Sequence, residues 1–204
     1  MEKFILDLCY RGNRNYIQGA DIYLSVCDLL TKSNFNDNLS DFKLLIQKFT
    51  DKQNDIFISA PGEAIDYPEG FTARFSCNSS KGKLSGYFME NNNLVNCRYP
   101  YNEEEIKNQC LINDHFIEFQ GKVSYTTIEI VVAMTKYLHM QKFKDKQGKW
   151  IISKLEIKRP FTEMDKNKIS IKLIKNFSYK LTKSQIICNN EVIGDIFFSL
   201  VGEK

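Results

Sequence analysis

The sequence predicts an α+β protein made of two similar halves, each with one buried helix packed against an antiparallel sheet. Three observations support this prediction: a short segment that occurs twice, a long apolar helix after each copy, and strand-like runs separated by turns after each helix. We place the halves at residues 1–105 and 106–204, because the segment 100–113, which contains three consecutive glutamates, is the best junction between them.

The repeated segment surrounds a glycine and a tyrosine. It reads YRGNRNY at residues 10–16 and FQGKVSY at residues 119–125. The offset is 109 for both the glycines (121 − 12) and the tyrosines (125 − 16), so the two copies align without a gap. A short apolar run precedes each copy, at residues 4–8 and 116–119. A repeat of this length indicates a duplicated half-domain rather than a solenoid unit.

The elements of the first half follow from their hydrophobic patterns. Alternating apolar residues predict a strand over residues 1–9, which a polar loop at residues 10–16 follows. Residues 17–30 form a helix that is apolar on most sides, as is typical of a buried helix. Further strands, with turns at 79–82 and 91–93, are predicted over residues 41–49, 56–60, 71–77, 83–89 and 94–99.

The second half repeats this order. A strand at 116–119 leads into a longer helix at 126–143, and Asn189-Asn190 form a hairpin turn between the last two strands. We expect the final strand, residues 191–200, to lie at a sheet edge, where it could pair with a second copy of the chain in a homodimer. The strands of this half cover residues 150–158, 168–174, 176–188 and 191–200.

Composition and charge exclude several classes of function. The net charge of +3 is small and the lysines are scattered, so we expect no nucleic-acid partner. The N-terminus lacks the pattern of a signal peptide, and the longest apolar helix is too short to span a membrane. The six cysteines form no CxxC pair and have no metal-type spacing with His115 or His139. We therefore expect reduced cysteines, no metal or other cofactor, and a cytoplasmic protein.

The order of strand, glycine-containing loop, apolar central helix and antiparallel strands resembles the hot-dog fold, and two tandem copies resemble a double hot-dog. The family it resembles is the β-hydroxyacyl-ACP dehydratase and acyl thioesterase superfamily. In the dehydratases an aromatic-x-Gly-His-Phe-Pro segment leads into the central helix. Phe119-Gln120-Gly121 matches the aromatic-x-Gly part, and Ala133-Met134 is similar to a small-then-large pair in the helix. The resemblance covers nearly the whole chain as architecture, and a few residues of each copy as sequence.

The chain departs from the dehydratase pattern at both catalytic positions. The dehydratase histidine would fall at Lys122 and, in the first copy, at Asn13. Its acidic partner would fall near Val132 and Tyr23. Dehydration needs a base at the α-carbon and an acid at the departing hydroxyl, and neither copy retains that pair. An ordinary dehydratase is therefore not expected.

The resemblance implies a site at the starts of the two central helices. In hot-dog proteins the carbonyl of an acyl thioester points at the amino end of that helix, and the pantetheine arm runs between the two halves of a fused form. In the first copy this implies Asp21 as the base, Tyr16 as a proton donor, and Asn15 as a group that orients a water or holds the carbonyl. The residues expected to bind substrate there are Asn13, Arg14, Gln18 and Gly19.

Other residues extend this candidate site, and simpler roles compete with it. Glu63, in the loop 61–68, is a second candidate base that could also bind substrate. Turn-forming roles for the asparagines, a solvent-exposed helix face for Asp21, and packing of the same joint by Tyr16 and Tyr125 explain the same residues without chemistry. His139 ends the second helix, where the dipole favours a cation. The second copy contributes the candidate substrate-binding residues Lys122, Ser124 and Tyr125.

These features favour an enzyme that acts on an acyl thioester of coenzyme A or acyl carrier protein. Hydrolysis is the simplest reaction, because it needs only a polarised carbonyl and an activated water. A modified dehydratase-like step in fatty acid or polyketide metabolism is a related interpretation. The alternative is a non-catalytic module that binds an acyl thioester or a carrier protein. The sequence does not determine which half holds the site.

Overall fold

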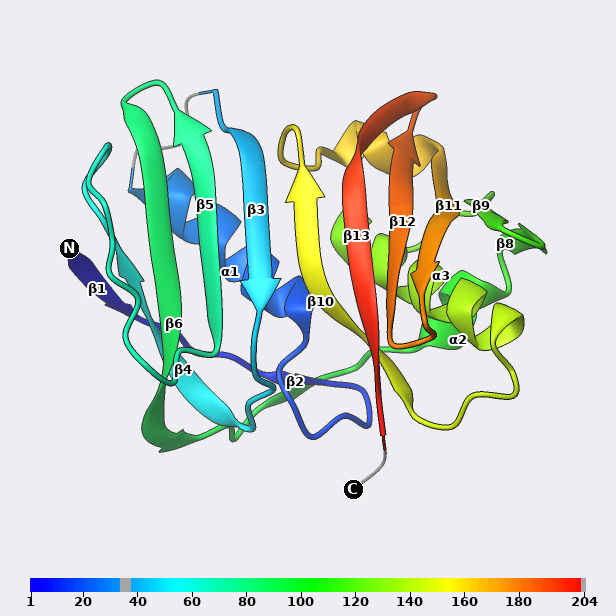
Figure 1. Ribbon diagram of the computed structural model, residues 1–204, viewed down its shortest axis with the longest axis horizontal. Coiled ribbons are helices and arrows are strands. Elements are labelled where there is room, and N and C mark those ends of the chain that lie inside the picture. The colour runs from blue at the N-terminus through cyan, green and yellow to red at the C-terminus, as the bar shows by residue number, and fades with distance from the viewer. Residues whose placement is uncertain (34–37, 203–204) are drawn as a thin grey trace. The chain divides into compact units, whose positions relative to one another are not determined.

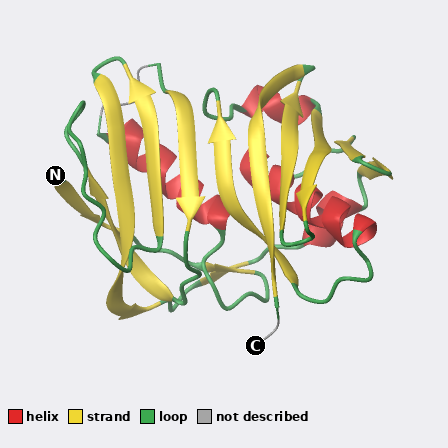
Figure 2. Cartoon of the chain, in the orientation of Figure 1, coloured by secondary structure: helices red, strands yellow, loops and turns green. Residues whose placement is uncertain are grey.

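The computed structural model describes residues 1–33 and 38–202 of the chain. The contacts divide the chain into two compact units, Met1–Tyr101 with Lys158–Pro160 and Asn102–Ile157 with Phe161–Lys204. Each unit combines one long helix with antiparallel strands (Figures 1 and 2). The boundary between halves at 105/106 that the sequence suggests stays a prediction.

Within residues 1–33 and 38–101, five antiparallel strands form the sheet of the first unit. Their order is β1 (Glu2–Ile5), β4 (Lys52–Ile58), β6 (Gly82–Leu94), β5 (Ala73–Ser79) and β3 (Ser40–Ile46). The predicted turn at 91–93 is wrong, because β6 continues through it and pairs with β4 out to Leu94. Asn91 donates a side-chain hydrogen bond of 2.9 Å to Asp55 of β4, which holds this asparagine in the strand.

The helix α1 (Gly19–Lys32) covers one face of this sheet, as the sequence predicts (Figure 1). Its buried residues include Tyr23, Val26 and Leu30, which recur at the spacing of one helix face. Tyr23 packs edge-on against Phe42 of β3, with 5.2 Å between ring centroids. Phe42 in turn stacks on Phe75 of β5 at 6.3 Å. These aromatic contacts fix the helix to the sheet and so fix where its first turn lies.

The strands of the second unit have the order β10 (Lys149–Ile157), β13 (Glu191–Val201), β12 (Leu181–Cys188), β11 (Ile169–Phe177), β9 (Phe116–Phe119) and β8 (Cys110–Asn113). The predicted hairpin turn is confirmed: Asn189 and Asn190 have φ of +50° and +67° between β12 and β13. The prediction that residues 191–200 form an edge is wrong. β13 pairs with β10 on one side and β12 on the other, so its backbone groups are already used.

The second central helix, α3 (Thr127–Lys142), packs on this sheet and contacts two short helices that the sequence did not reveal. These are α2 (Glu103–Lys107), inside the predicted junction, and a 3₁₀ helix at Glu163–Asn167. No helix in the described ranges has both the length and the apolar character that a membrane crossing requires.

His139 is not the exposed cation that its place near the end of α3 suggests. It is fully buried, and its ring lies 4.7 Å from Trp150 and 5.4 Å from Phe198 between centroids. Nδ1 donates to the carbonyl oxygen of Thr135 at 2.5 Å, and Nε2 has no hydrogen-bond partner among the described residues. Burial lowers the pKa of His139 to about 4, so the ring is neutral near pH 7.

We expect His139 to make the protein less stable in mild acid. Its pKa is about 4 in the folded state and near 6.5 in the unfolded chain, so between these values the unfolded chain binds more protons. The free energy of unfolding should therefore fall as the pH drops from 6.5 to 4, by about 3 kcal/mol in all. Urea unfolding across this range checks it, with His139→Phe as the comparison. Equal pH dependence of the two proteins would contradict the expectation.

Cys9 and Cys97 form a disulfide, so the prediction that all the cysteines are reduced is wrong. The two residues are 88 positions apart in the sequence, and the fold brings their Cα atoms to 4.8 Å. No short spacing signals such a pair, because folding alone makes the two positions neighbours. Cys27, Cys77, Cys110 and Cys188 form no disulfide in the described part of the chain.

Candidate functional site

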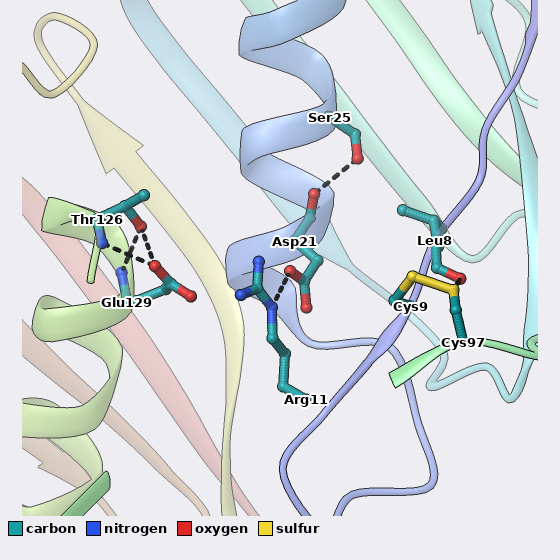
Figure 3. A network of polar contacts seen from close by, with 8 residues as sticks. All are labelled: Leu8, Cys9, Arg11, Asp21, Ser25, Cys97, Thr126 and Glu129. Carbon is teal, nitrogen blue, oxygen red and sulfur yellow. Dashed lines mark hydrogen bonds and ion pairs between the residues drawn. A yellow bond between two sulfur atoms is a disulfide. The ribbon is translucent and has the colours of Figure 1, made fainter. Parts of the chain in front are cut away.

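A two-stranded parallel ribbon leads into the first helix. It consists of β2 (Tyr10–Arg11) and β7 (Arg98–Tyr99), where the sequence predicted one longer strand at 94–99. The Cys9–Cys97 disulfide lies directly before both strands and joins them (Figure 3). Two residues per strand make a weak pairing, so the covalent link sets their register. The ribbon thereby fixes the position of Arg11.

The loop between the ribbon and α1 is held by backbone and side-chain contacts. Gly12 has φ of +53°, and a Cβ atom there would lie 2.7 Å from the carbonyl oxygen of Tyr101. Arg98 Nη1 donates to the carbonyl oxygens of Gly12 at 2.5 Å and Arg14 at 2.7 Å. The Gln18 side-chain oxygen, with its amide turned to satisfy both partners, accepts from Nη1 and Nε of Arg14 at 2.6 and 2.7 Å. The loop is therefore a fixed scaffold for the helix start.

The first turn of α1 is buried, and two of its backbone N–H groups have no recorded acceptor among the described residues. Its N-cap residue, Gln18, makes no side-chain capping bond. The Gln18 carbonyl accepts from the N–H groups of Asp21 at 3.0 Å and Ile22 at 3.1 Å, while the structure records no acceptor for those of Gly19 and Ala20 in the described chain. Both residues are buried within the unit and have little or no side chain of their own. Unsatisfied N–H groups at a helix start carry partial positive charge and attract an anion or a polarised carbonyl.

A carboxylate lies in the same turn. Asp21 is 8% exposed, so the interpretation of this residue as part of a solvent-exposed helix face is wrong. Its Oδ1 accepts from Arg11 Nε at 2.8 Å, and Figure 3 shows the arginine reaching from the ribbon to the helix. Ser25, one turn later, donates to the Asp21 carbonyl oxygen at 2.8 Å. The ion pair holds the carboxylate beside the N–H groups of that turn.

The start of α3 is closed by its own side chains. Thr126 and Glu129 form a capping box: Glu129 Oε2 accepts from Thr126 N at 2.7 Å and from Thr126 Oγ1 at 2.6 Å, and Glu129 N donates to Thr126 Oγ1 at 3.4 Å (Figure 3). Glu129 follows its N-cap by three positions, as Asp21 follows Gln18. The same acidic position therefore stabilises one helix and meets an arginine in the other.

Solved structures with similar architecture extend over nearly the whole chain. The TesB protein of Mycobacterium avium subspecies paratuberculosis is 9% identical with a TM-score of 0.51, covering 97% of this chain and 90% of that one. The dehydratase domain of PpsC from Mycobacterium tuberculosis, in complex with C12:1-CoA, is 7% identical with a TM-score of 0.52, covering 97% and 88%. The chain has a double hot-dog fold. No family model and no curated protein sequence matches it. At these identities the likeness shows the fold alone.

The remaining candidate residues of the first hot-dog unit lie around the helix start at different depths. Asn13 and Asn15 are exposed on the loop surface. Tyr16 is half-buried, and its ring packs edge-on against Phe49 at 5.4 Å between centroids. Glu63 is exposed, and its Oε2 accepts from Ala60 N at 3.1 Å within its own loop. No interaction in residues 1–33 and 38–202 joins Glu63 to the start of α1.

The candidates of the second hot-dog unit form a separate set. Lys122 and Ser124 are exposed, and the Lys122 backbone N–H donates to Gln109 at 2.8 Å. The Tyr125 hydroxyl accepts from the Asn102 N–H at 3.0 Å. Tyr16 packs on Phe49, and the interpretation that both repeat tyrosines pack the same joint stays a prediction. The two N-caps are 108 positions apart (126 − 18), one fewer than the repeat offset, so the copies diverge at the helix starts.

Sequence reasoning missed the two arginines that organise the site, Arg11 and Arg98. Both belong to the ribbon, which depends on contacts between residues far apart in the chain. One signal was available, since Cys9 and Cys97 are each followed by a Tyr–Arg or Arg–Tyr pair. Burial raises the pKa of Cys27 to about 11, which removes it as a nucleophile near pH 7. Within the described residues no group of three or more His, Cys, Asp or Glu side chains could hold a metal ion.

We expect Thr126→Ala to separate stability from function. Removing the hydroxyl opens the capping box and should lower the free energy of unfolding by about 1 kcal/mol. Urea unfolding followed by the fluorescence of Trp150, which packs beside α3 through His139, measures this change. Thioester binding or turnover should stay unchanged, since α3 uses its own side chains at this end. An unchanged unfolding midpoint, or a loss of turnover, would contradict the assignment of this helix to a structural role.

Proposed function

We propose that the first hot-dog unit binds an acyl thioester with its carbonyl at the amino end of α1 and hydrolyses it. The observation that carries this proposal is that one buried helical turn combines the Gly19 and Ala20 N–H groups, for which no acceptor is recorded, with the Asp21 carboxylate. An uncapped start beside a fixed carboxylate costs stability and suits a reacting carbonyl.

The chemistry needs three events. Asp21 accepts a proton from a water as the water oxygen attacks the thioester carbonyl carbon. The carbonyl oxygen becomes an oxyanion, which accepts hydrogen bonds from Gly19 and Ala20 N–H. The tetrahedral intermediate then re-forms the carbonyl and expels the thiolate, which takes up a proton and leaves as free thiol. Arg11 keeps the carboxylate oriented. Asn15 and Gln18 position the thioester, and Tyr16 serves as proton donor to the leaving sulfur.

Hydrolysis fits the residues better than dehydration does. The dehydratase histidine is replaced by Lys122 and Asn13, and the positions of its acidic partner hold the buried Val132 and Tyr23. A helix-start N–H pair and one carboxylate suffice for hydrolysis, whereas a dehydratase needs a second acid–base group. The structural relatives are a TesB protein and a dehydratase domain solved with an acyl-CoA, which supports a thioester as the ligand class.

A second candidate function is a binding module without catalysis. The Arg11–Asp21 ion pair favours it, because a carboxylate already bonded to a guanidinium is a weaker proton acceptor. In this case the same helix start would hold the carbonyl, and Asp21 would only fix the ribbon to α1.

Thiol release from a panel of acyl-CoA thioesters of different chain lengths tests the proposal. Calorimetry with the non-hydrolysable thioether analogues measures binding in parallel. Saturable turnover supports hydrolysis, and binding without turnover supports the module. If neither is observed, the acyl-thioester proposal is overturned and only the fold stands. Assembly as a homodimer and a cytoplasmic location remain predictions from the sequence.

A further inference from the structure

The ribbon beside the candidate site carries arginines stacked on tyrosines. In its parallel register Tyr10 is opposite Arg98 and Arg11 is opposite Tyr99. Each pair makes a cation–π contact, at 5.1 Å for the first and 5.3 Å for the second. The loop adds a third such contact at 5.1 Å. We call this set the Arg–Tyr cluster; its members are Tyr10, Arg11, Arg14, Arg98, Tyr99 and Tyr101.

Arg98 is the member of the cluster best placed to meet a ligand. Arg98 is exposed, and no carboxylate in the described part of the chain forms an ion pair with its guanidinium. One nitrogen, Nη1, donates to the carbonyl oxygens of Gly12 and Arg14. Among the residues that the structure describes, no acceptor is recorded for its Nε and Nη2 groups. Arg98 is therefore charged, accessible and still able to donate.

The guanidinium of Arg98 is also held in place before any ligand arrives. The cation–π contact holds the guanidinium over the Tyr10 ring, and hydrogen bonds to two carbonyl oxygens hold its Nη1 group. Donors in the plane of a stacked guanidinium remain available, and their fixed fork matches the oxygens of a phosphate. A side chain that is already ordered loses less entropy on binding.

The cluster connects directly to the proposed thioester site. Arg98 holds the carbonyl of Arg14, and the Arg14 guanidinium reaches the amide of Gln18, the N-cap of α1. A ligand held at both ends of this loop would have its carbonyl at the helix start and a negative group at the ribbon. Thioesters of coenzyme A and of carrier proteins share that chemistry, since in both the pantetheine arm ends in a phosphate.

We propose that Arg98 is a phosphate-binding residue that recognises the phosphate at the end of the pantetheine arm. This inference rests on the proposed function and deepens it, because it names the part of the substrate that the ribbon binds. Arg98 also supports the loop before α1 through Gly12 and Arg14, a role that affects all carriers equally, whereas its contact with a phosphate affects only the phosphorylated carriers.

The test compares one acyl group on three carriers: pantetheine, 4′-phosphopantetheine and coenzyme A. Wild-type protein should bind the two phosphorylated thioesters about 10-fold or more tightly than the acyl-pantetheine. Arg98→Gln should remove this preference, and the loss of its hydrogen bonds to the loop should weaken the binding of all three carriers by one common factor. A rise in salt should weaken only the phosphorylated pair. A gain with coenzyme A alone would assign the recognised charge to its nucleotide phosphates, and a gain with both to the phosphate on pantetheine.

Two further variants keep the result interpretable. Arg74 is an exposed arginine of the same unit that does not belong to the ribbon. Its guanidinium lies 4.9 Å from the centroid of the Tyr67 ring. Arg74→Gln is therefore the matched control and should leave the affinities for all three carriers unchanged. Arg98→Lys keeps the charge if Arg98→Gln unfolds, and should retain part of the preference.

Each contrary outcome has a distinct meaning. Equal affinity for all three carriers overturns the inference while the proposed function stands. An equal loss on all three carriers in Arg98→Gln that leaves the preference for phosphorylated carriers intact also overturns it, because the residue would then only support the loop. Absence of binding to any thioester overturns the proposed function, and this inference with it.

Discussion

Asp21→Asn is expected to lower thioester turnover by about 10²- to 10⁴-fold, the range for loss of a general base. The change keeps the size of the side chain and removes its charge and its ability to accept a proton from water. Because the N–H groups of Gly19 and Ala20 are untouched, binding of the thioester should be largely retained. The expected result is therefore a fall in kcat with a small change in KM, measured by thiol release.

Asp28→Asn is the matched control for this variant. Asp28 lies two turns further along α1, its side chain is 61% exposed, and it pairs with Lys32 on the helix surface. Its removal should leave turnover unchanged and alter stability by a few tenths of a kcal/mol at most. If Asp21→Asn keeps full turnover, the base lies elsewhere. If the wild type binds thioesters without turnover, the binding module is the better description.

Cys97→Ser is expected to lower the free energy of unfolding of the first unit by about 2–4 kcal/mol. The disulfide closes a loop of 88 positions, which restricts the unfolded chain, and it also holds the short ribbon together. Reductant should shift the wild type to the same unfolding midpoint and leave the variant where it is.

Two probes locate the effect of this substitution. The single tryptophan, Trp150, lies in the second unit, whereas circular dichroism follows both units. Loss of the disulfide should shift the dichroism transition more than the fluorescence transition. Cys110→Ser, which removes a free thiol of the second unit, is the control. Coincident and unshifted transitions in Cys97→Ser would show that the link contributes no stability.

The sequence predicts those parts of the fold that depend on neighbouring residues. Both central helices and the Asn189-Asn190 hairpin lie where periodicity and turn chemistry indicate. The ribbon, the disulfide and the Arg11–Asp21 pair join positions far apart in sequence or depend on a short parallel pairing, so no local pattern reveals them. His139 shows the opposite error: its sequence position suggests an exposed cation, but the core around Trp150 makes it neutral.

The candidate site shows the same division. The resemblance to a known family points to the helix starts, and Asp21 is a natural candidate there. The side-chain contacts favour the start of α1 over the start of α3 as the candidate site. Glu129 hydrogen-bonds back to Thr126, whereas Asp21 pairs with Arg11. This choice depends on which partner a carboxylate reaches in three dimensions, and the two acidic residues look equivalent in the sequence.

The different fates of the two acidic residues bear on how a duplicated chain can evolve. Reactive sites and fold stability make opposing demands on the same helix turn, since capping groups that strengthen a helix also occupy its polar backbone atoms. A single-copy ancestor must compromise between them at one position. After duplication, one copy can keep Glu129 as an anchor while the other gives up its cap at Gln18. The chain then tolerates the uncapped, less stable first turn of α1 because the capped start of α3 stabilises the other copy.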